Sequence, residues 1–585
     1  MSENKKFFGV NSENWGHKWG YRDSNFIVND DKSVTFTGNR YPVCGKKLTK
    51  FIPFVEEALG VEFDIKPKVQ ELERKYIEQY NTNNDFIDEL KSLFEEDRYT
   101  FTDNERLLHS HGQHSTDEVY KVLYNKLKNF TDLVFYVEDE EEAIQLIDLA
   151  KKHNVCLIPY GGGTNVTNAL RVPEEEKRMI VSVDTRRMNK IESIDKKNLM
   201  ASVQAGITGK KLEEGLNKAG FTAGHEPDSY EFSTVGGWIS TNAAGMKKHK
   251  YGNIEDIVQN ITMITPSGVI NQIKPLTRAS IGIKTQNILF GSEGNLGLIT
   301  KATLKIHPLP KKSAYESIIF HDWEKGVSFM QDLFQSNMVP ASARLADNLQ
   351  IRFGSALKEE KEGFSGTLDK LQKYFIFNIK GFDPEKFTAA TFKVEGSDLE
   401  VKHQLENLKS LAKKHKGFIA GESTGKSGYL ATMVIAYIRE LIFTQNILGE
   451  TMETSVPWSN INQVKSEAYK LLIKLHKNYN LPGKPFFTSR ISKIYHTGVC
   501  MYNTIAMCFD GVENPEDVFT EIEYALRENF IKNGGSISHH HGVGKLRKDF
   551  MVKTISKGSI SMIQGIKKAQ DPDNIFGVNN NIVKK

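Results

Sequence analysis

A run of three glycines is the clearest candidate for chemistry in this sequence. It lies in Pro159–Val166 (PYGGGTNV), directly after an apolar segment that is typical of a buried strand. Glycines have no Cβ, so consecutive backbone N–H groups can point into one concavity and hold phosphate oxygens. A plain glycine turn has the same sequence, and this segment alone leaves both interpretations open.

Two later segments combine small residues with polar ones. Pro227–Gly245 is dense in hydroxyl and amide side chains, and Gly291–Thr300 places glycines on both sides of Glu293 before an apolar strand. Such segments allow the backbone to pass close to a flat ligand with many acceptors. Each could be an ordinary loop, but three of them in this order and spacing favour one extended ligand.

Tyr502 and a run of three histidines are candidates for proton transfer. Tyr502 lies in an alternating strand pattern, VCMYNTIAMCF, where a core tyrosine is the usual interpretation. A phenol has an unperturbed pKa of about 10, so it needs a cationic or hydrogen-bonding neighbour to act as a base. His539, His540 and His541 could supply that neighbour, and we expect His541 to pair with Tyr502. The run also fits a metal site, since His539 and His541 would share one face of a strand.

These candidates need secondary structure to position them. Asp132–Val137 and Cys156–Tyr160 are typical of strands, and Glu140–Lys152 carries a helical apolar stripe between them. This strand–helix–strand unit ends at the glycine run. Pro308 and Pro310 mark a boundary, and a second α/β domain is expected beyond it.

Composition excludes several classes of protein. A chain of 585 residues exceeds the size of one ordinary core, and a net charge of +4 is too mild to indicate nucleic-acid binding. The cysteines form no CxxC pair, so neither a disulfide framework nor a zinc ribbon is indicated. We expect no membrane span, no secretory signal and no C-terminal Ser-Lys-Leu signal. The four cysteines are Cys44, Cys156, Cys500 and Cys508.

The three segments resemble the FAD-binding signature of the vanillyl-alcohol-oxidase/p-cresol methylhydroxylase superfamily. The resemblance implies an α+β fold: a two-lobed FAD-binding domain, an α/β cap domain and an N-terminal helical extension. It also implies non-covalent FAD, with the pyrophosphate on the glycine run and the flavin along the later segments. The implied FAD contacts are Tyr160, Gly161, Gly162, Gly163, Thr164, Asn165, Val166, Asp228, Ser229, Tyr230, Glu231, Phe232, Ser233, Thr234, Thr241, Asn242, Ala243, Ala244, Glu293, Gly294, Asn295, Leu296, Gly297, Leu298 and Ile299.

Longer phrases from about residue 100 onward resemble the alkyldihydroxyacetonephosphate synthase family. Among them are GHEPDSYEFSTVGGW, ASARLADN, ETSVPW and GGSISHHHGVGKLRKDF. The resemblance implies exchange of the acyl group of acyl-dihydroxyacetone phosphate for a long-chain fatty alcohol, through a flavin N5 adduct and without net redox. It assigns catalysis to Tyr502, His539, His540 and His541, and substrate binding to Arg439, Arg344, Thr451 and His225.

The same resemblance implies four regions, a cellular setting and an assembly. We expect an N-terminal helical extension (1–95), the FAD-binding domain (96–308), a cap domain (309–512) and a C-terminal segment returning to the flavin (513–585). A peroxisomal location, contact with a membrane surface and a homodimer are also implied.

Two alternatives stay open from the residues alone, and one of them is a binding protein that keeps flavin only as a structural element. An FAD-dependent D-2-hydroxy-acid dehydrogenase would share the fold and the HGxG phrase, sometimes with a metal ion. Ala420–Ser427 (AGESTGKS) fits a relaxed P-loop pattern. Without an apolar strand ending in Asp downstream, we expect no nucleotide hydrolysis.

Overall fold

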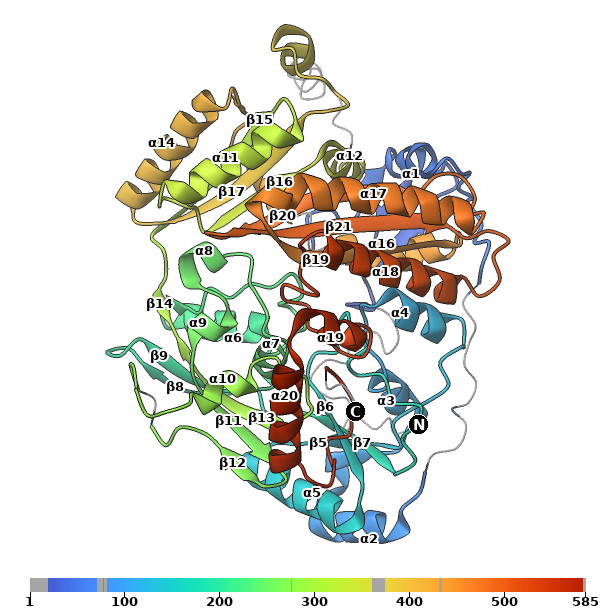
Figure 1. The fold of residues 1–585 in the computed structure, drawn as a ribbon, viewed down its shortest axis with the longest axis vertical. Helices are drawn as coiled ribbons and strands as arrows, with labels where there is room; N and C mark the ends of the chain where they lie inside the picture. The colour runs from blue at the N-terminus through green and yellow to red at the C-terminus, as the bar shows by residue number, and fades with distance from the viewer. Residues whose placement is uncertain are drawn as a thin grey trace.

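The computed structural model describes residues 19–70, 77, 81–274, 276–359, 374–430 and 434–581. Figure 1 shows two lobes along the long axis of the molecule, with the glycine-rich segments in the lower lobe and one large sheet in the upper lobe. Among the described residues, no helix is both long enough and apolar enough to cross a membrane.

A parallel sheet in the lower lobe positions the glycine run. Strands β5 (Leu133–Tyr136), β7 (Ile180–Asp184) and β6 (Cys156–Tyr160) are parallel, and β4 (Tyr99–Thr100) adds to β5 at the edge. Helix α5 (Glu140–His153) makes the crossover from β5 to β6 and buries its apolar stripe. Because β6 ends at Tyr160, the glycine run begins at the carboxyl edge of this sheet.

A second, antiparallel sheet in the lower lobe positions the other two polar segments. Helix α7 (Val235–Thr241) packs beside it, and the Gly291–Thr300 segment runs directly into one of its strands. The core between this sheet and α7 is apolar. In order across the sheet, the strands are β12 (Gly268–Ile270), β11 (Val258–Thr265), β13 (Leu298–Lys305), β9 (Met200–Gln204) and β8 (Ile191–Asp195).

The upper lobe is built on a seven-stranded antiparallel sheet. Helices α11 (Trp323–Gln335), α14 (Asp398–Lys414), α17 (Ile461–Asn478) and α18 (Pro515–Lys532) share one apolar core with its strands. Residues on the other face of β19, β20 and β21 face the lower lobe. In order across the sheet, the strands are β18 (Phe418–Ile419), β15 (Lys312–Phe320), β17 (Thr388–Gly396), β16 (Ser342–Ala346), β20 (Phe486–Ile494), β21 (Gly498–Cys508) and β19 (Ile447–Pro457).

The N-terminal region contributes to both lobes. Helix α2 (Asn84–Leu93) packs on α5, whereas α1 (Phe51–Leu59) packs on α12 (Asn348–Ala356) in the upper lobe. A small three-stranded sheet precedes α1, and the sequence patterns did not predict it. Residues 1–18, 71–76 and 78–80 lie outside the described residues, so most of the helical pattern before α2 is not tested. The small sheet consists of β1 (Phe26–Val28), β2 (Val34–Phe36) and β3 (Lys47–Leu48).

The C-terminal segment returns to the lower lobe. After α18, the histidine loop leads to α19 (Met551–Thr554) and then to α20 (Lys557–Gln570), which lies along the lower lobe in Figure 1. The Asn580 side chain then donates to the Glu293 carbonyl oxygen at 2.8 Å. The boundaries at residues 95, 308 and 512 remain a proposal.

Lys567 gives a test of how firmly α20 is attached. Its Nζ donates to the carbonyl oxygens of Asn295 at 2.7 Å and Phe576 at 3.0 Å, and to the buried Asp571 carboxylate at 2.5 Å. Removing one partner of a buried ion pair costs about 3–5 kcal/mol. We expect Lys567→Ala to lower the free energy of unfolding by about 3 kcal/mol in denaturant titrations.

The exposed neighbour Lys568 provides the matched control. Lys568→Ala should change stability by less than about 0.5 kcal/mol, as exposed substitutions usually do. Equal effects of the two substitutions would contradict the anchoring role of Lys567.

Candidate functional site

A cavity of about 410 Å³ brings the three polar segments together with the upper sheet. Its wall includes the whole of Tyr160–Val166 and parts of the two later segments. The wall also includes residues of β19 and β21, Tyr502, the histidine loop, and an apolar extension with residues of α1. The arrangement can therefore hold a long ligand against a proton-transfer group.

The glycine run is required by a close approach of two backbones. A Cβ at Gly162 would stand 2.1 Å from the Phe232 carbonyl oxygen, and one at Gly161 would stand 2.5 Å from Thr234 Oγ1. Side chains at these positions would force the loop away from the Pro227–Gly245 segment. The segments predicted to share a ligand thus also pack on each other.

Two buried polar atoms in the cavity wall fit a bound cofactor. Tyr160 Oη and Asn165 Nδ2 have no hydrogen-bond partner among the described residues, and both residues line the cavity. Buried polar atoms are normally paired, so unpaired ones facing a cavity indicate a ligand with hydrogen-bonding groups. The diphosphate and ribityl groups of FAD offer such partners.

The predicted FAD contacts divide into two groups. Those that line the cavity are Tyr160, Gly161, Gly162, Gly163, Thr164, Asn165, Val166, Asp228, Ser229, Ser233, Thr234, Thr241, Ala243, Glu293, Gly294, Gly297, Leu298 and Ile299.

The other group lies behind the wall or beside it. Glu231 accepts a hydrogen bond from Tyr41 at 2.8 Å, and Phe232 packs on Trp19 with ring centroids 5.1 Å apart. Asn295 donates to the Asn580 carbonyl oxygen at 2.8 Å. These side chains support the loops that form the wall. The members of this group are Tyr230, Glu231, Phe232, Asn242, Ala244, Asn295 and Leu296.

Tyr502 is placed by the register of three strands. It lies opposite Glu453 on β19 and opposite Arg490 on β20. Side chains of directly opposed residues point to the same face of a sheet, so all three face the lower lobe. The Arg490 guanidinium lies 4.5 Å from the centroid of the Tyr502 ring.

The histidine loop approaches Tyr502 from the C-terminal segment. His540 Nε2 lies 2.5 Å from Tyr502 Oη, and His541 Nε2 lies 3.3 Å from it. His541 therefore contacts Tyr502 as predicted, but His540 is the nearer partner. The sequence could not give this order, because it depends on how the loop is turned over β21.

Burial sets the charge state of Tyr502 and of the histidines beside it. Burial raises the pKa of Tyr502 well above its ordinary value, and the nearby Asp228 adds to the effect. Burial also lowers the pKa of His539 and of His541 to about 3. Of the two expected kinds of neighbour, cationic or hydrogen-bonding, the histidines are therefore hydrogen-bonding neighbours of the phenol. At neutral pH the histidines and Tyr502 are uncharged.

Cationic side chains of β20 lie in the cavity wall or near it. Arg490 lines the cavity, and its Nη2 lies 3.6 Å from an Asp228 carboxylate oxygen. The predicted Arg344 lies 3.9 Å from the same carboxylate but is not among the residues of the cavity wall. Lys493, also on β20, is buried, and burial lowers its pKa. Sequence reasoning missed Arg490 and Lys493. A cationic side chain within the strand pattern FFTSRISKI was a signal that could have identified both residues.

The remaining predicted substrate residues differ in setting. Arg439 lines the cavity, but its guanidinium donates to the carbonyl oxygens of Gln113 and His114. Thr451 also lines the cavity, with its hydroxyl 3.4 Å from that of Thr504. His225 is buried, and neither ring nitrogen has a hydrogen-bond partner in the part of the chain that the structure describes.

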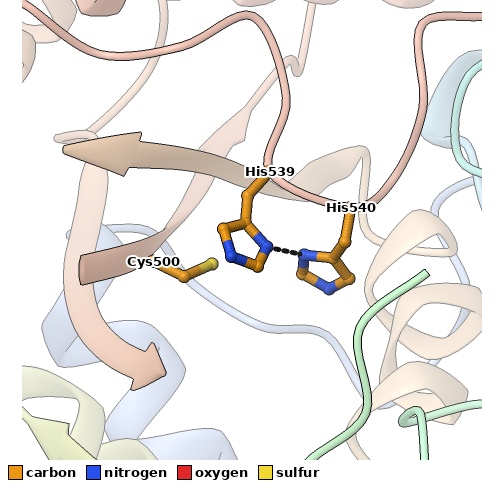
Figure 2. Close-up of side chains that lie close together, drawn as sticks. All are labelled: Cys500, His539 and His540. Carbon is orange, nitrogen blue, oxygen red and sulfur yellow. Dashed lines mark hydrogen bonds between the residues drawn. The ribbon is translucent and has the colours of Figure 1, made fainter. Parts of the chain in front are cut away.

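Metal-type ligands also meet beside Tyr502. Figure 2 shows Cys500 on β21 facing His539 and His540, whose ligand atoms all lie within 4.8 Å of one another. The two histidine Nδ1 atoms already share a hydrogen bond of 2.8 Å. Lys493 and Lys248 add positive charge beside His539. Both features oppose a cation, so we assign no metal to this group.

The apolar extension of the cavity is formed by several elements. Phe51 and Phe54 of α1, Phe353 of α12, and Ile435 and Ile442 of the upper lobe line this extension. Their side chains would shield hydrocarbon from water, which contributes about 25 cal/mol per Å² of buried apolar surface. A ligand that is polar at one end and aliphatic at the other fits this cavity.

Comparison with known proteins gives consistent results. Residues 131–274 match the family model "FAD binding domain" and residues 309–579 match "FAD linked oxidases, C-terminal domain". A Caenorhabditis elegans alkyldihydroxyacetonephosphate synthase is 39% identical over 95% of this chain and 93% of its own length.

Solved structures extend the comparison to the fold. A structure of alkyldihydroxyacetonephosphate synthase superposes with a TM-score of 0.85 at 27% identity, covering 98% of this chain and 99% of the other. A substrate-bound p-cresol methylhydroxylase superposes with a TM-score of 0.65 at 15% identity, over 84% and 95% of the two chains. The predicted fold class and the FAD cofactor are confirmed.

Gly162 gives a direct test of the cofactor loop. We expect Gly162→Val to yield folded protein without FAD, because the new side chain must displace the loop from Phe232. The measurement is the ratio of flavin to protein absorbance after purification. Gly354→Ala is the control, since a Cβ at Gly354 would meet no atom of the described residues within 4 Å. Full FAD occupancy in Gly162→Val would contradict the assignment of this loop.

Proposed function

The chain belongs to the alkyldihydroxyacetonephosphate synthase family, and we propose that its cavity exchanges the acyl group of acyl-dihydroxyacetone phosphate for a long-chain fatty alcohol. The products are alkyl-dihydroxyacetone phosphate and a free fatty acid. The protein is an FAD-dependent alkylglycerone-phosphate synthase of ether-lipid biosynthesis.

One structural observation supports this proposal independently of the family. A buried tyrosine, Tyr502, lies in the same cavity as the FAD loop, a cationic side chain and an apolar extension. The substrates need all four features, because they combine a phosphate, an acidic C–H group and long hydrocarbon chains.

The protein's own groups have separate tasks in this reaction. The C1 hydrogen of the substrate lies next to a ketone, so a base can remove it where the developing charge is stabilised. Tyr502 takes this proton. Arg490 binds the phosphate, together with the predicted Arg439 and Thr451, because a guanidinium can donate to two phosphate oxygens at once. Arg344 and His225 support the wall from behind.

FAD supplies an electrophilic ring system when it is bound, and the exchange needs no net electron transfer. We propose that FAD is held non-covalently by Tyr160–Val166 and by the cavity-lining parts of the two later segments. Tyr160 Oη and Asn165 Nδ2 would donate hydrogen bonds to it.

The cellular setting follows from the same family. We propose a peroxisomal protein that contacts a membrane surface, since both the acyl chain and the alcohol partition into lipid, and that forms a homodimer. Imaging of tagged full-length protein, vesicle flotation and sedimentation equilibrium test these three points. Even cytosolic staining would contradict the peroxisomal location, a lack of flotation would contradict the membrane contact, and a monomer would contradict the homodimer.

A mass balance tests the reaction itself. With acyl-dihydroxyacetone phosphate and hexadecanol, we expect fatty acid and ether product in equal amounts, and little bleaching of the flavin without air. Bleaching by a D-2-hydroxy acid, with no ether product, would instead support the dehydrogenase alternative.

Tyr502→Phe tests the base. The substitution removes only the phenolic oxygen, so FAD should still bind, while exchange of the C1 hydrogen with solvent should fall by about 10²–10⁴-fold. We expect a similar loss in His540→Ala and a smaller one in His541→Ala, because His540 is 2.5 Å and His541 3.3 Å from the phenol. The measurement is tritium wash-out from C1. Near-normal wash-out in Tyr502→Phe would eliminate this tyrosine as the base.

A further inference from the structure

Four side chains form a continuous chain of hydrogen bonds that starts at Tyr502. Tyr502 Oη lies 2.5 Å from His540 Nε2, and His540 Nδ1 lies 2.8 Å from His539 Nδ1, the bond drawn in Figure 2. His539 Nε2 then lies 2.6 Å from Tyr495 Oη. Tyr502 is buried, whereas Tyr495 is partly exposed and precedes the exposed His496. The chain thus connects the cavity to the protein surface.

The protons on this chain can be counted. Four uncharged groups carry one exchangeable proton each, and the three hydrogen bonds between them use three. One proton therefore points outward, either from Tyr502 toward the cavity and His541 Nε2, which lies 3.3 Å away, or from Tyr495 toward Asn253 Oδ1, which lies 3.5 Å away. In the second arrangement Tyr502 donates to His540, and its oxygen presents a lone pair to the cavity. The two arrangements differ only in which partner donates in each of the three hydrogen bonds.

We infer that Tyr502, His540, His539 and Tyr495 form a proton relay that carries the C1 proton of the substrate to solvent and back. The C1–H bond breaks, its electron pair moves onto the adjacent carbonyl group, and Tyr502 Oη gains the proton. Tyr502 passes its own proton to His540 Nε2, His540 passes its Nδ1 proton to His539, and His539 passes its Nε2 proton to Tyr495. Tyr495 releases its hydroxyl proton to water. One proton enters and one leaves, and the reverse sequence returns a proton to C1.

The electrostatics of the site favour a route without charged side chains. Burial opposes both a phenolate at Tyr502 and an imidazolium at His539, so a base that had to hold charge would be costly here. When the protons move together, every member of the relay is uncharged before and after the movement. Tyr502 can therefore accept a proton although its own pKa is raised.

Tyr495 is held in place by contacts outside the relay. Lys248 Nζ lies 3.4 Å from the centroid of its ring, a cation–π distance, and the Trp458 indole donates to its backbone carbonyl oxygen at 3.2 Å. Tyr495 and His539 touch neither substrate nor FAD in this scheme. They are positioning residues that act through Tyr502.

The test uses FAD-loaded Tyr495→Phe. We expect C1 wash-out to fall by about 10- to 100-fold, at or below the ~10²-fold cost of losing a whole general base. The dependence of the rate on the fraction of D₂O should change from curved, for several protons in motion, to linear. The low-field His539 N–H resonance should also shift in the resting protein. Tyr479→Phe is the control, because it removes a tyrosine hydroxyl bonded to Glu521 on the surface.

A second variant protects the test against a folding defect. His539→Gln keeps an amide able to bond to Tyr495 but cannot pass a proton, so it should reproduce the slow wash-out and the linear D₂O dependence. Normal wash-out with a curved D₂O dependence in either FAD-loaded variant would overturn the relay.

This inference rests on the proposed function, and the two can fail separately. If wild-type protein forms no ether product, the proposed function fails. If it forms product, and Tyr502→Phe stops wash-out while Tyr495→Phe does not, only the relay fails.

Discussion

Two buried carboxylates fix the loop on which the rest of the site depends. Glu453, on β19, accepts hydrogen bonds from Ser538 Oγ at 2.5 Å and from the backbone N–H of His541 at 3.0 Å. Glu293, in the lower lobe, accepts from the backbone N–H of Val543 at 2.5 Å and Gly544 at 2.7 Å. The loop is therefore held by one carboxylate from each lobe. Charge-assisted hydrogen bonds of this kind are about twice as strong as neutral ones.

This double attachment explains why proton transfer and cofactor binding occur in one cavity. Glu453 lies opposite Tyr502 in the strand register, so a loop bonded to Glu453 must pass over the phenol. Glu293 lies in the cavity wall beside the cofactor segments. A loop bonded to both carboxylates sets the distance from the histidines to the tyrosine and to the flavin region together. Movement of either lobe would change both distances.

Local patterns predicted the parts of the site that depend on local structure. The glycine run follows from close backbone approach, and its segment lines the cavity as expected. What the sequence could not supply was register. The pairing of Tyr502 with Arg490, and the choice of His540 over His541, come from strand alignment and loop orientation, which no single segment encodes. The strands of two or three residues before α1 were too short to show a period.

The P-loop-like segment illustrates the limit of motif reasoning. Its Gly425 lies in α15 (Glu422–Leu430), and a Cβ there would stand 2.6 Å from the Glu316 carbonyl oxygen. The glycine is needed because the helix packs closely on β15. Lys426 is exposed. Packing thus accounts for the residue that made the pattern resemble a nucleotide site.

The cationic wall of the cavity has a counter-ion of its own. Asp228 lies 3.6 Å from Arg490 and 3.9 Å from Arg344, beyond the 2.7–2.9 Å of a direct charge-assisted bond. The carboxylate therefore balances charge without taking up the guanidinium donors. A phosphate entering the cavity can use the donors of Arg490, which lines the cavity, without first breaking a strong ion pair. The same carboxylate raises the pKa of Tyr502, whereas Arg490 lowers it, and burial is the largest effect. The net result keeps Tyr502 protonated, so an uncharged route for the proton is the more favourable one.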